Sequence, residues 1–271
     1  MPANRTYLAA SPPASPAPRT ARGESAPPDV AGLVEAAPLV TQPFDHVYLR
    51  NVFPPAFYAT LLEQLPATRR YREMRHREAI RPDGRSARRK FYLFPEHVLL
   101  LPRAQRAFWL PLARQLCSRE LQDAFKQRFR AALERRFGTP IESLSFYAVP
   151  MLLRDFGGYR IGIHGDSMRK AITVQLYLPR DASQAHLGTL LHAGRTGEAA
   201  ERVFALQFLP ATGYAFPVMR HESWHSVATT SEADGVRDSL MISYMVQDTP
   251  ASWVMERLKR LWLFFAYFLR R

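Results

Sequence analysis

Residues 159–178 read Tyr-Arg-Ile-Gly-Ile-His-Gly-Asp-Ser-Met-Arg-Lys-Ala-Ile-Thr-Val-Gln-Leu-Tyr-Leu. This stretch contains two short runs rich in β-branched and aromatic residues, 159–164 and 171–178, separated by a polar turn. Runs of this kind are typical of β-strands. Six more occur in the second half of the chain, at 144–153, 188–192, 203–209, 214–219, 224–230 and 239–246. Eight short strands at this spacing predict an antiparallel sandwich or barrel.

His164 ends the first of these strands, and Asp166 follows it by two residues. Side chains two apart on an extended chain lie on the same face, so these two can bind one ion together. Two imidazoles and one carboxylate on one side of a metal form the facial triad that holds non-haem Fe(II). His225, in a later predicted strand, supplies the second imidazole. We therefore predict a metal site formed by His164, Asp166 and His225, with three adjacent coordination positions left open.

Several short motifs accompany the predicted ligands. They are 154–159 (Arg-Asp-Phe-Gly-Gly-Tyr), 164–166 (His-Gly-Asp), 170–178 (Lys-Ala-Ile-Thr-Val-Gln-Leu-Tyr-Leu), 187–189 (Leu-Gly-Thr), 210–216 (Pro-Ala-Thr-Gly-Tyr-Ala-Phe), 225–227 (His-Ser-Val) and 237–239 (Arg-Asp-Ser). With these motifs, residues 144–245 resemble the Fe(II)/2-oxoglutarate-dependent dioxygenases, close to their prolyl-4-hydroxylase-like branch. Residues 43–65 also resemble the start of many bacterial members. The resemblance implies a mainly β fold with supporting helices (α+β), in which N-terminal helices pack on one sheet of a double-stranded β-helix, the cupin-like jelly roll.

The resemblance also implies a role for each site residue. His164, Asp166 and His225 would hold Fe(II) and form the catalytic centre. Arg237, twelve residues after His225, would pair with the distal carboxylate of 2-oxoglutarate, which a bidentate guanidinium suits better than lysine does. Ser239 would hydrogen-bond the same carboxylate, and Tyr159 would line that pocket or the substrate wall. The implied reaction consumes O2, converts 2-oxoglutarate to succinate and CO2, and usually hydroxylates the substrate.

Basic residues surround the predicted metal pair, and Arg154, Arg160 and Lys170 are the candidate substrate-binding residues. Clustered cations favour an anionic substrate, so we expect an acidic small molecule, a sugar or a lipid-linked molecule. Hydroxylation of a prolyl residue in a peptide is the alternative that the resemblance offers. Analogy at the level of the fold does not fix a substrate, and both hypotheses remain open.

Two other functions compete with this one. Residues 221–225, His-Glu-Ser-Trp-His, match the H-E-x-x-H signature of zinc hydrolases, in which Glu222 would act as the base. That signature requires a helix, whereas Pro217 upstream and the strand-like residues 227–230 downstream favour an extended chain. The third hypothesis is a non-catalytic β-barrel binding protein, in which the same residues only line a polar interior.

Composition limits the partners and the compartment. The chain carries a formal charge of +13, mostly from arginine. Its basic runs contain neither interleaved stacking aromatics nor zinc-finger spacing, so we expect a solvated basic surface and no nucleic-acid partner. The single cysteine, Cys117, excludes an intramolecular disulfide and a metal site with several cysteine ligands. We find no secretory signal and no spanning segment in the sequence, and we expect a cytoplasmic protein.

The first half of the chain predicts fewer elements. Residues 43–49 alternate like a strand, and two prolines open a helix at 54–65. Residues 101–137 are helical in pattern, with Ser118 as a cap and Gly138 as the stop. The charged segment between these helices, residues 69–90, predicts a solvated loop, with a lid over the site as the alternative.

Three parts make up the predicted organisation. Residues 1–42, rich in Ala and Pro, predict a mobile tail, and residues 43–250 a single dioxygenase domain with its β-helix core at about 141–246. Residues 251–271 predict a basic, hydrophobic helix whose apolar run is shorter than the about 20 residues needed to span a bilayer. Through residues 253–271 this helix would pack on the barrel, form a homodimer contact, or lie in an anionic membrane interface. The last option would place the protein peripherally at the inner face of the membrane.

Overall fold

The computed structural model of the chain describes residues 27–75, 77–247 and 250–268. Its strands are β1 (Val47–Leu49), β2 (Arg72–Glu73), β3 (Arg88–Tyr92), β4 (Phe146–Asp155), β5 (Ile161–His164), β6 (Lys170–Tyr177), β7 (Thr189–His192), β8 (Val203–Ala205), β9 (Gly213–Pro217), β10 (Trp224–Val227) and β11 (Arg237–Val246). Its α-helices are α1 (Val30–Ala36), α2 (Pro55–Glu63), α3 (Pro95–Val98), α4 (Arg103–Leu116), α5 (Arg119–Arg128), α6 (Arg130–Phe137), α7 (Gly197–Glu201) and α8 (Pro250–Phe268). Short 3₁₀ helices are η1 (Thr68–Arg70), η2 (Arg77–Ala79), η3 (Ile141–Ser143) and η4 (Ala182–Leu187).

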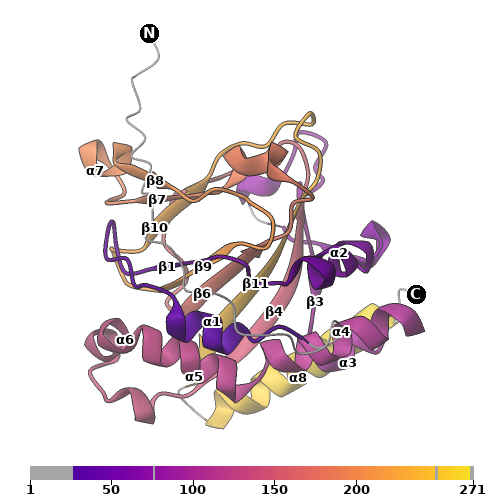
Figure 1. Ribbon diagram of the computed structural model, residues 1–271, viewed down its shortest axis with the longest axis horizontal. Helices are drawn as coiled ribbons and strands as arrows, with labels where there is room; N and C mark the ends of the chain where they lie inside the picture. Colours follow the sequence, from indigo (N-terminus) through magenta and orange to yellow (C-terminus); the bar gives the residue numbers. More distant parts are fainter. Residues whose placement is uncertain (1–26, 76, 248–249, 269–271) are drawn as a thin grey trace.

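The strands form two antiparallel sheets (Figure 1). The larger sheet has the order β1-β9-β6-β11-β4-β3-β2, and the smaller sheet has the order β5-β10-β7-β8. Each of the eight predicted runs forms one of the strands β4 to β11, so the predicted antiparallel architecture is confirmed. Aromatic and aliphatic side chains from both sheets and from the loop between β8 and β9 are buried together, among them Tyr177, Leu191, Phe208 and Phe216.

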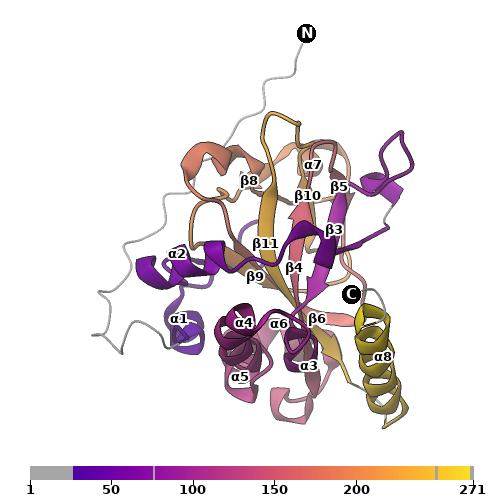
Figure 2. The same cartoon turned by 90° about the vertical axis from the view of Figure 1, so that its right-hand side faces the viewer.

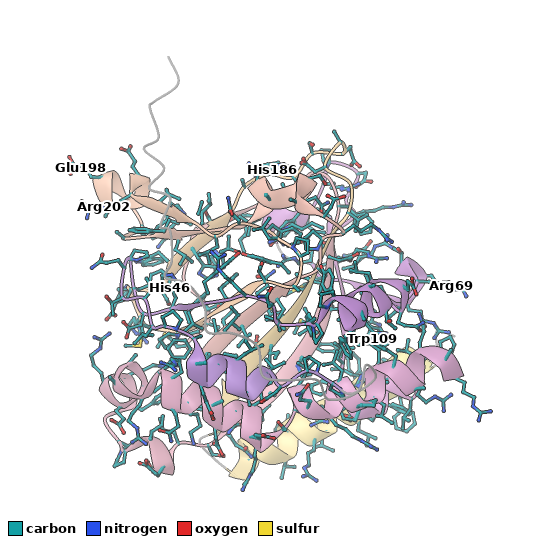
Figure 3. The ribbon with its side chains drawn as sticks, viewed as in Figure 1. His46, Arg69, Trp109, His186, Glu198 and Arg202 are labelled. Atoms are coloured by element: carbon teal, nitrogen blue, oxygen red, sulfur yellow. The ribbon has the colours of Figure 1, made fainter. Side chains whose placement is uncertain are left out.

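A layer of helices covers the outer face of the larger sheet (Figure 1). Residues 101–137 are helical as predicted, but they are divided into α4, α5 and α6. The Ser118 hydroxyl caps α5 by accepting a backbone N–H at 3.2 Å, and Gly138 ends α6 in a left-handed conformation with a φ of 66°. Trp109 of α4 is fully buried in this layer (Figure 3) and donates a hydrogen bond to the Gln64 carbonyl at 2.6 Å. The main hydrophobic core therefore lies between helices and sheet, apart from the smaller cluster between the two sheets.

The prediction of a mobile tail over residues 1–42 is wrong in its last part, because α1 lies within it. The Asp29 carboxylate caps this helix by accepting the Gly32 N–H at 2.9 Å. Val30 and Val34 are buried, and α1 packs on α5. Tertiary packing thus stabilises a helix that is too short to be stable alone. Residues 1–26 of the predicted tail lie outside the described part of the chain.

The charged segment 69–90 is more ordered than a solvated loop. Its end forms β3, which pairs with β4, and β2 pairs with β3 at the edge of the larger sheet. Arg69 is exposed at the periphery of the molecule (Figure 3). Between β2 and β3, η2 contacts β5, and the Glu78 carboxylate accepts a hydrogen bond from the Gly162 N–H. This part of the segment therefore lies against the strand that carries one of the predicted metal ligands.

Helix α8 lies beside α3 at one side of the larger sheet (Figure 2). Leu263 is buried in a cluster with Tyr92 and Phe94, and Arg260 donates two hydrogen bonds to Glu96 at 2.8 and 2.9 Å. The predicted C-terminal helix is confirmed, and one of its faces packs on the domain. None of the helices in the described part of the chain combines the length and the apolar character needed to cross a membrane.

Candidate functional site

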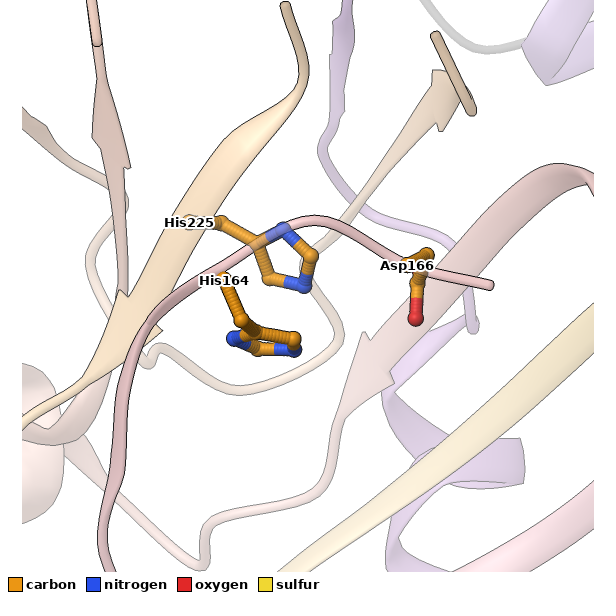
Figure 4. A group of neighbouring side chains, drawn as sticks. All are labelled: His164, Asp166 and His225. Atoms are coloured by element: carbon orange, nitrogen blue, oxygen red, sulfur yellow. The ribbon is translucent and has the colours of Figure 1, made fainter. Parts of the chain in front are cut away.

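The three predicted metal ligands lie together where β5 meets β10 (Figure 4). The two strands pair so that His225 is directly opposite His164, and the centres of the two rings are 4.2 Å apart. Asp166 follows β5 by two residues and lies beside the rings. One ligand atom from each of the three residues lies within 4.8 Å of the other two. The group is therefore compact enough to bind one ion from one side.

Each histidine has one ring nitrogen fixed by the backbone. His164 Nδ1 is 3.0 Å from the Gly162 carbonyl oxygen, and His225 Nδ1 is 3.1 Å from the Ser223 carbonyl oxygen. A carbonyl only accepts hydrogen bonds, so in the neutral rings Nδ1 carries the proton and Nε2 keeps its lone pair. Backbone bonds of this kind orient metal-binding imidazoles. Burial also lowers the pKa of His225 from 6.5 to about 4, which keeps that ring neutral at physiological pH.

Both oxygens of the Asp166 carboxylate have partners. Lys170 Nζ donates to Oδ1 at 2.7 Å, and the Thr173 hydroxyl donates to Oδ2 at 2.5 Å. Burial by itself would raise the pKa of Asp166, but the Lys170 ammonium, His225 and these hydrogen bonds together hold it well below its usual range. The carboxylate is therefore ionised and oriented. Two imidazoles and one carboxylate form a donor set that fits a divalent metal such as Fe(II).

Arg237, at the start of β11, is fully buried. Its Nη1 donates to Asp155 Oδ2 at 2.9 Å, and its Nε donates to the Leu187 carbonyl at 2.9 Å. Its Nη2 is also buried, and within the described part of the chain it has no hydrogen-bond partner. Two of the three guanidinium nitrogens are thus fixed by the protein, and the third is available to a ligand.

A row of side chains on β6 connects the metal ligands with Arg237. Thr173, Gln175 and Tyr177 are two residues apart and so share one face of the strand. Thr173 contacts the carboxylate of the metal group, and Gln175 donates to the Ser239 hydroxyl at 3.0 Å. The ring centre of Tyr177 is 5.8 Å from the Arg237 guanidinium. The two predicted groups therefore face the same interior, with Ser239 between them.

No protein-family model matches this sequence, and no curated protein matches it either. Among solved structures, the dioxygenase for auxin oxidation 1 from Arabidopsis thaliana, in its binary complex with 2-oxoglutarate, superposes with a TM-score of 0.51 at 12% sequence identity. The superposition covers 80% of this chain and 87% of that one. The chain has this dioxygenase fold. The double-stranded β-helix that the sequence resemblance implies is thereby confirmed.

Two prolyl hydroxylases are also similar to the chain in structure. The enzyme from Trichoplax adhaerens has a TM-score of 0.48 at 13% identity, over 80% of this chain and 87% of its own. The prolyl-4-hydroxylase from Pseudomonas putida has a TM-score of 0.46 at 15% identity, over 81% of this chain and 100% of its own.

The dioxygenase fold brings two more predicted residues to the site. Lys170, predicted as a substrate-binding residue, donates a hydrogen bond to the Asp166 carboxylate, so it orients a predicted metal ligand. Tyr159 is 2% exposed, and the Arg88 guanidinium lies over its ring, 4.0 Å from the ring centre. Burial raises the pKa of the Tyr159 hydroxyl, which therefore stays protonated. Tyr159 thus packs on Arg88, the partner of Asp155, and its role in a 2-oxoglutarate or substrate pocket stays a prediction.

The other two predicted substrate-binding residues differ in their surroundings. Arg154 is on the opposite face of β4 from Asp155, and its guanidinium donates to Asp238 at 2.7 and 2.8 Å. Arg160 is exposed and lines a cavity of about 510 Å³ beside β5, together with His192 and other residues. None of the three metal ligands lines this cavity. The structure thus makes Arg154 a member of an ion pair and leaves Arg160 accessible from solvent.

The zinc-hydrolase hypothesis is wrong, because residues 221–225 form no helix. His221 lies in a turn with a φ of 64°, and β10 begins at Trp224. Glu222 forms an ion pair with Arg135 at 2.6 Å. The two histidines of the H-E-x-x-H match therefore do not share a helical face, and only His225 belongs to the metal group.

The sequence does not reveal two residues of the site, Arg88 and Asp155. Asp155 on β4 lies between Arg237 on β11 and Arg88 on β3, its partners in the sheet register. It is fully buried and accepts two hydrogen bonds from Arg88, at 2.6 and 2.8 Å. Asp155 is the last residue of β4 and stands in the motif 154–159, which is a sequence signal, whereas Arg88 stands in a run of basic residues that gives none.

Proposed function

We propose that the chain is an Fe(II)- and 2-oxoglutarate-dependent dioxygenase. The observation that supports this most is the buried Nη2 of Arg237, which lacks a partner among the described residues. A buried donor without a partner costs about 1–3 kcal/mol, and more when the group is charged. A ligand carboxylate would remove this cost, and carboxylates match the geometry of a guanidinium. The distal carboxylate of 2-oxoglutarate fits this role, because the other end of the molecule is a metal chelator.

The proposal gives each residue of the metal group a task. His164, Asp166 and His225 would hold Fe(II), while Lys170 and Thr173 orient the carboxylate ligand. Fe(II), with 2-oxoglutarate and O2, supplies the oxidising chemistry of the reaction. The chain itself has to position the substrate and exclude water.

At the other end of the interior, Arg237 and Ser239 would bind the distal carboxylate. The rings of Tyr177 and Phe208 lie 5.8 and 4.6 Å from the Arg237 guanidinium and shield it from water. A charge-assisted hydrogen bond is stronger in such an environment than in water. The Asp155 carboxylate holds the guanidinium in place, so little reorganisation accompanies binding.

We further propose that the substrate is anionic, as a small molecule, a sugar or a lipid-linked molecule. Arg160 and Arg169 are exposed and flank the segment that carries His164 and Asp166. In a chain with a formal charge of +13, such cations attract anions to the site. We also propose a cytoplasmic location, which the single cysteine favours. The salt dependence of turnover tests the anionic substrate.

The main test is binding of 2-oxoglutarate to the Fe(II)-loaded protein in the absence of O2. Wild-type protein is expected to show the weak visible charge-transfer band of a chelated 2-oxo acid, and Asp166→Ala is expected to lose it. Arg237→Met should raise the Kd of 2-oxoglutarate about 10- to 100-fold, because a hydrogen bond to a charged group contributes about 1.5–3 kcal/mol. Arg88 keeps Asp155 paired in this variant.

The matched ligand is 2-oxobutanoate, which lacks the distal carboxylate. Its affinity should be the same for wild type and Arg237→Met, because it has no group to pair with Arg237. If Arg237→Met lowered the affinity for both acids equally, Arg237 would stabilise the fold and would not bind the distal carboxylate. A folded wild-type protein that shows no band would refute the dioxygenase. Succinate release over a panel of anionic and prolyl-peptide substrates then separates the two substrate classes.

A further inference from the structure

Helix α8 presents an apolar stripe to solvent. Ten large hydrophobic side chains are exposed in the described part of the chain, and six of them lie on this helix. They are 47–65% exposed and comprise Val254, Met255, Leu258, Leu261, Trp262 and Phe265. Spacings of three and four residues place these side chains on one face of the helix. A stripe of this kind marks a surface that contacts something other than water.

The opposite face of α8 holds the helix against the domain. Leu263 is 8% exposed and packs with apolar residues of the larger sheet. Arg260 forms its two bonds with Glu96, and Arg72 donates to the Ala266 carbonyl at 2.8 Å. These contacts fix the rotation of the helix about its own axis. The apolar stripe therefore faces solvent, because the opposite side of the helix packs on the domain.

The charge of the protein discriminates between the partners that could cover this stripe. A second copy would bring another formal charge of +13 against the first, and self-repulsion opposes such a contact. An anionic lipid surface attracts the same charge, at about 1 kcal/mol for each Lys or Arg close to it. Arg257 is exposed on the helix beside the stripe. An apolar face with aromatic residues and basic neighbours is typical of helices that lie in the membrane interface.

We propose that α8 docks the protein on an anionic phospholipid surface, with its apolar stripe in the interface. Helix α8 has 19 residues and would lie in the plane of the surface over a length of about 28 Å. It remains packed on the domain through Leu263 and Arg260, so docking needs no rearrangement of the fold. This proposal does not depend on the reaction that the site performs.

The test uses the full chain and vesicles of phosphatidylcholine with or without phosphatidylglycerol. Sedimentation should show binding to the vesicles that contain phosphatidylglycerol, and the binding should weaken as salt is raised, because salt screens the attraction. Leu258→Ser with Trp262→Ser should lower the partition coefficient about tenfold or more, because both side chains lose the apolar area that enters the interface. Both are more than half exposed, so the fold should be unchanged.

Leu39→Ser is the matched control, because Leu39 is 39% exposed outside α8, and its partition coefficient should equal that of the wild type. Three outcomes would overturn the proposal. The first is no binding to either kind of vesicle. The second is equal binding by wild type and the α8 variant, which would mean that the basic surface as a whole, and not the stripe, binds the vesicles. The third is a dimer, seen by light scattering, that the α8 variant loses, because a second copy would then cover the stripe.

Discussion

Asp155 is the residue whose replacement tests the buried charges of the site most directly. It accepts two hydrogen bonds from Arg88, at 2.6 and 2.8 Å, and one from Arg237, at 2.9 Å. The side chains of Asp155 and Arg237 are 0% exposed, and that of Arg88 is 12% exposed. Asp155→Asn keeps the shape of the side chain but removes its charge. Two guanidinium groups then remain buried without an anion between them.

The expected loss follows from this geometry. Removing one partner of a buried ion pair usually lowers the free energy of unfolding by about 3–5 kcal/mol. At an effective dielectric constant of about 20, the attraction between unit charges about 4 Å apart is about 4 kcal/mol, which agrees. The Asn amide keeps one acceptor, so we expect a loss of about 3–4 kcal/mol. Domains are typically stable by about 5–15 kcal/mol, so the variant should fold but unfold at a much lower urea concentration.

Urea unfolding, followed by circular dichroism, measures this loss. Asp238→Asn is the matched control, because Asp238 accepts two hydrogen bonds from Arg154 across the same two strands. Burial raises the pKa of Asp238 in spite of Arg154. The cost of removing the Asp238 carboxylate from water therefore offsets most of its attraction to Arg154. We expect Asp238→Asn to cost about 1 kcal/mol. If Asp155→Asn costs no more than this control, the reasoning about the buried charges is refuted.

Two further predictions concern pH and salt. Burial lowers the pKa of His97 from 6.5 to about 4, so the unfolded chain binds a proton that the folded protein does not, and the free energy of unfolding falls as the pH is lowered between these values. In His97→Gln the free energy of unfolding should fall less than in the wild type over this pH range, by about 3 kcal/mol. Urea unfolding at several pH values measures this, and the same pH dependence in variant and wild type would refute the reasoning. Arg160→Gln with Arg169→Gln should raise the KM for an anionic substrate several-fold and reduce its salt dependence, whereas a KM unaffected by both changes would contradict an anionic substrate.

The strands could be predicted from the sequence because their signal is local. β6 and β11 consist mainly of buried apolar residues, and turn residues bound them on both sides. Helix α1 could not be predicted in this way, because its seven residues are stabilised mainly by contacts with α5 that no local pattern contains. The division of residues 101–137 is partly local, because Ser118 caps the start of α5, whereas the boundary between α5 and α6 at Phe129 has no such side-chain cap.

The site shows the same difference between local and distant information. The spacing of His164 and Asp166 is enough to place both on one face of an extended chain. The chemistry of a facial triad calls for a second imidazole, but no local pattern puts His225 opposite His164, and only the pairing of β5 with β10 shows it. Arg88 had no signal at all. It stands among other basic residues, as in a solvated loop, and its partner Asp155 is 67 residues away in the chain. Only the pairing of β3 with β4 identifies it as part of the site.

The balance of charge distinguishes this site from an ordinary structural ion pair. On one face of β4, Arg154 and Asp238 form a pair that is neutral by itself. On the other face, one carboxylate, that of Asp155, has to balance the guanidinium groups of Arg88 and Arg237. A buried excess of positive charge is costly, and folding alone gives no reason for it. An anion that neutralised the group and accepted the remaining N–H of Arg237 would remove the cost. Because the same interior also contains three residues that could hold a metal ion, a single molecule that chelates a metal at one end and carries a carboxylate at the other would account for both groups at once.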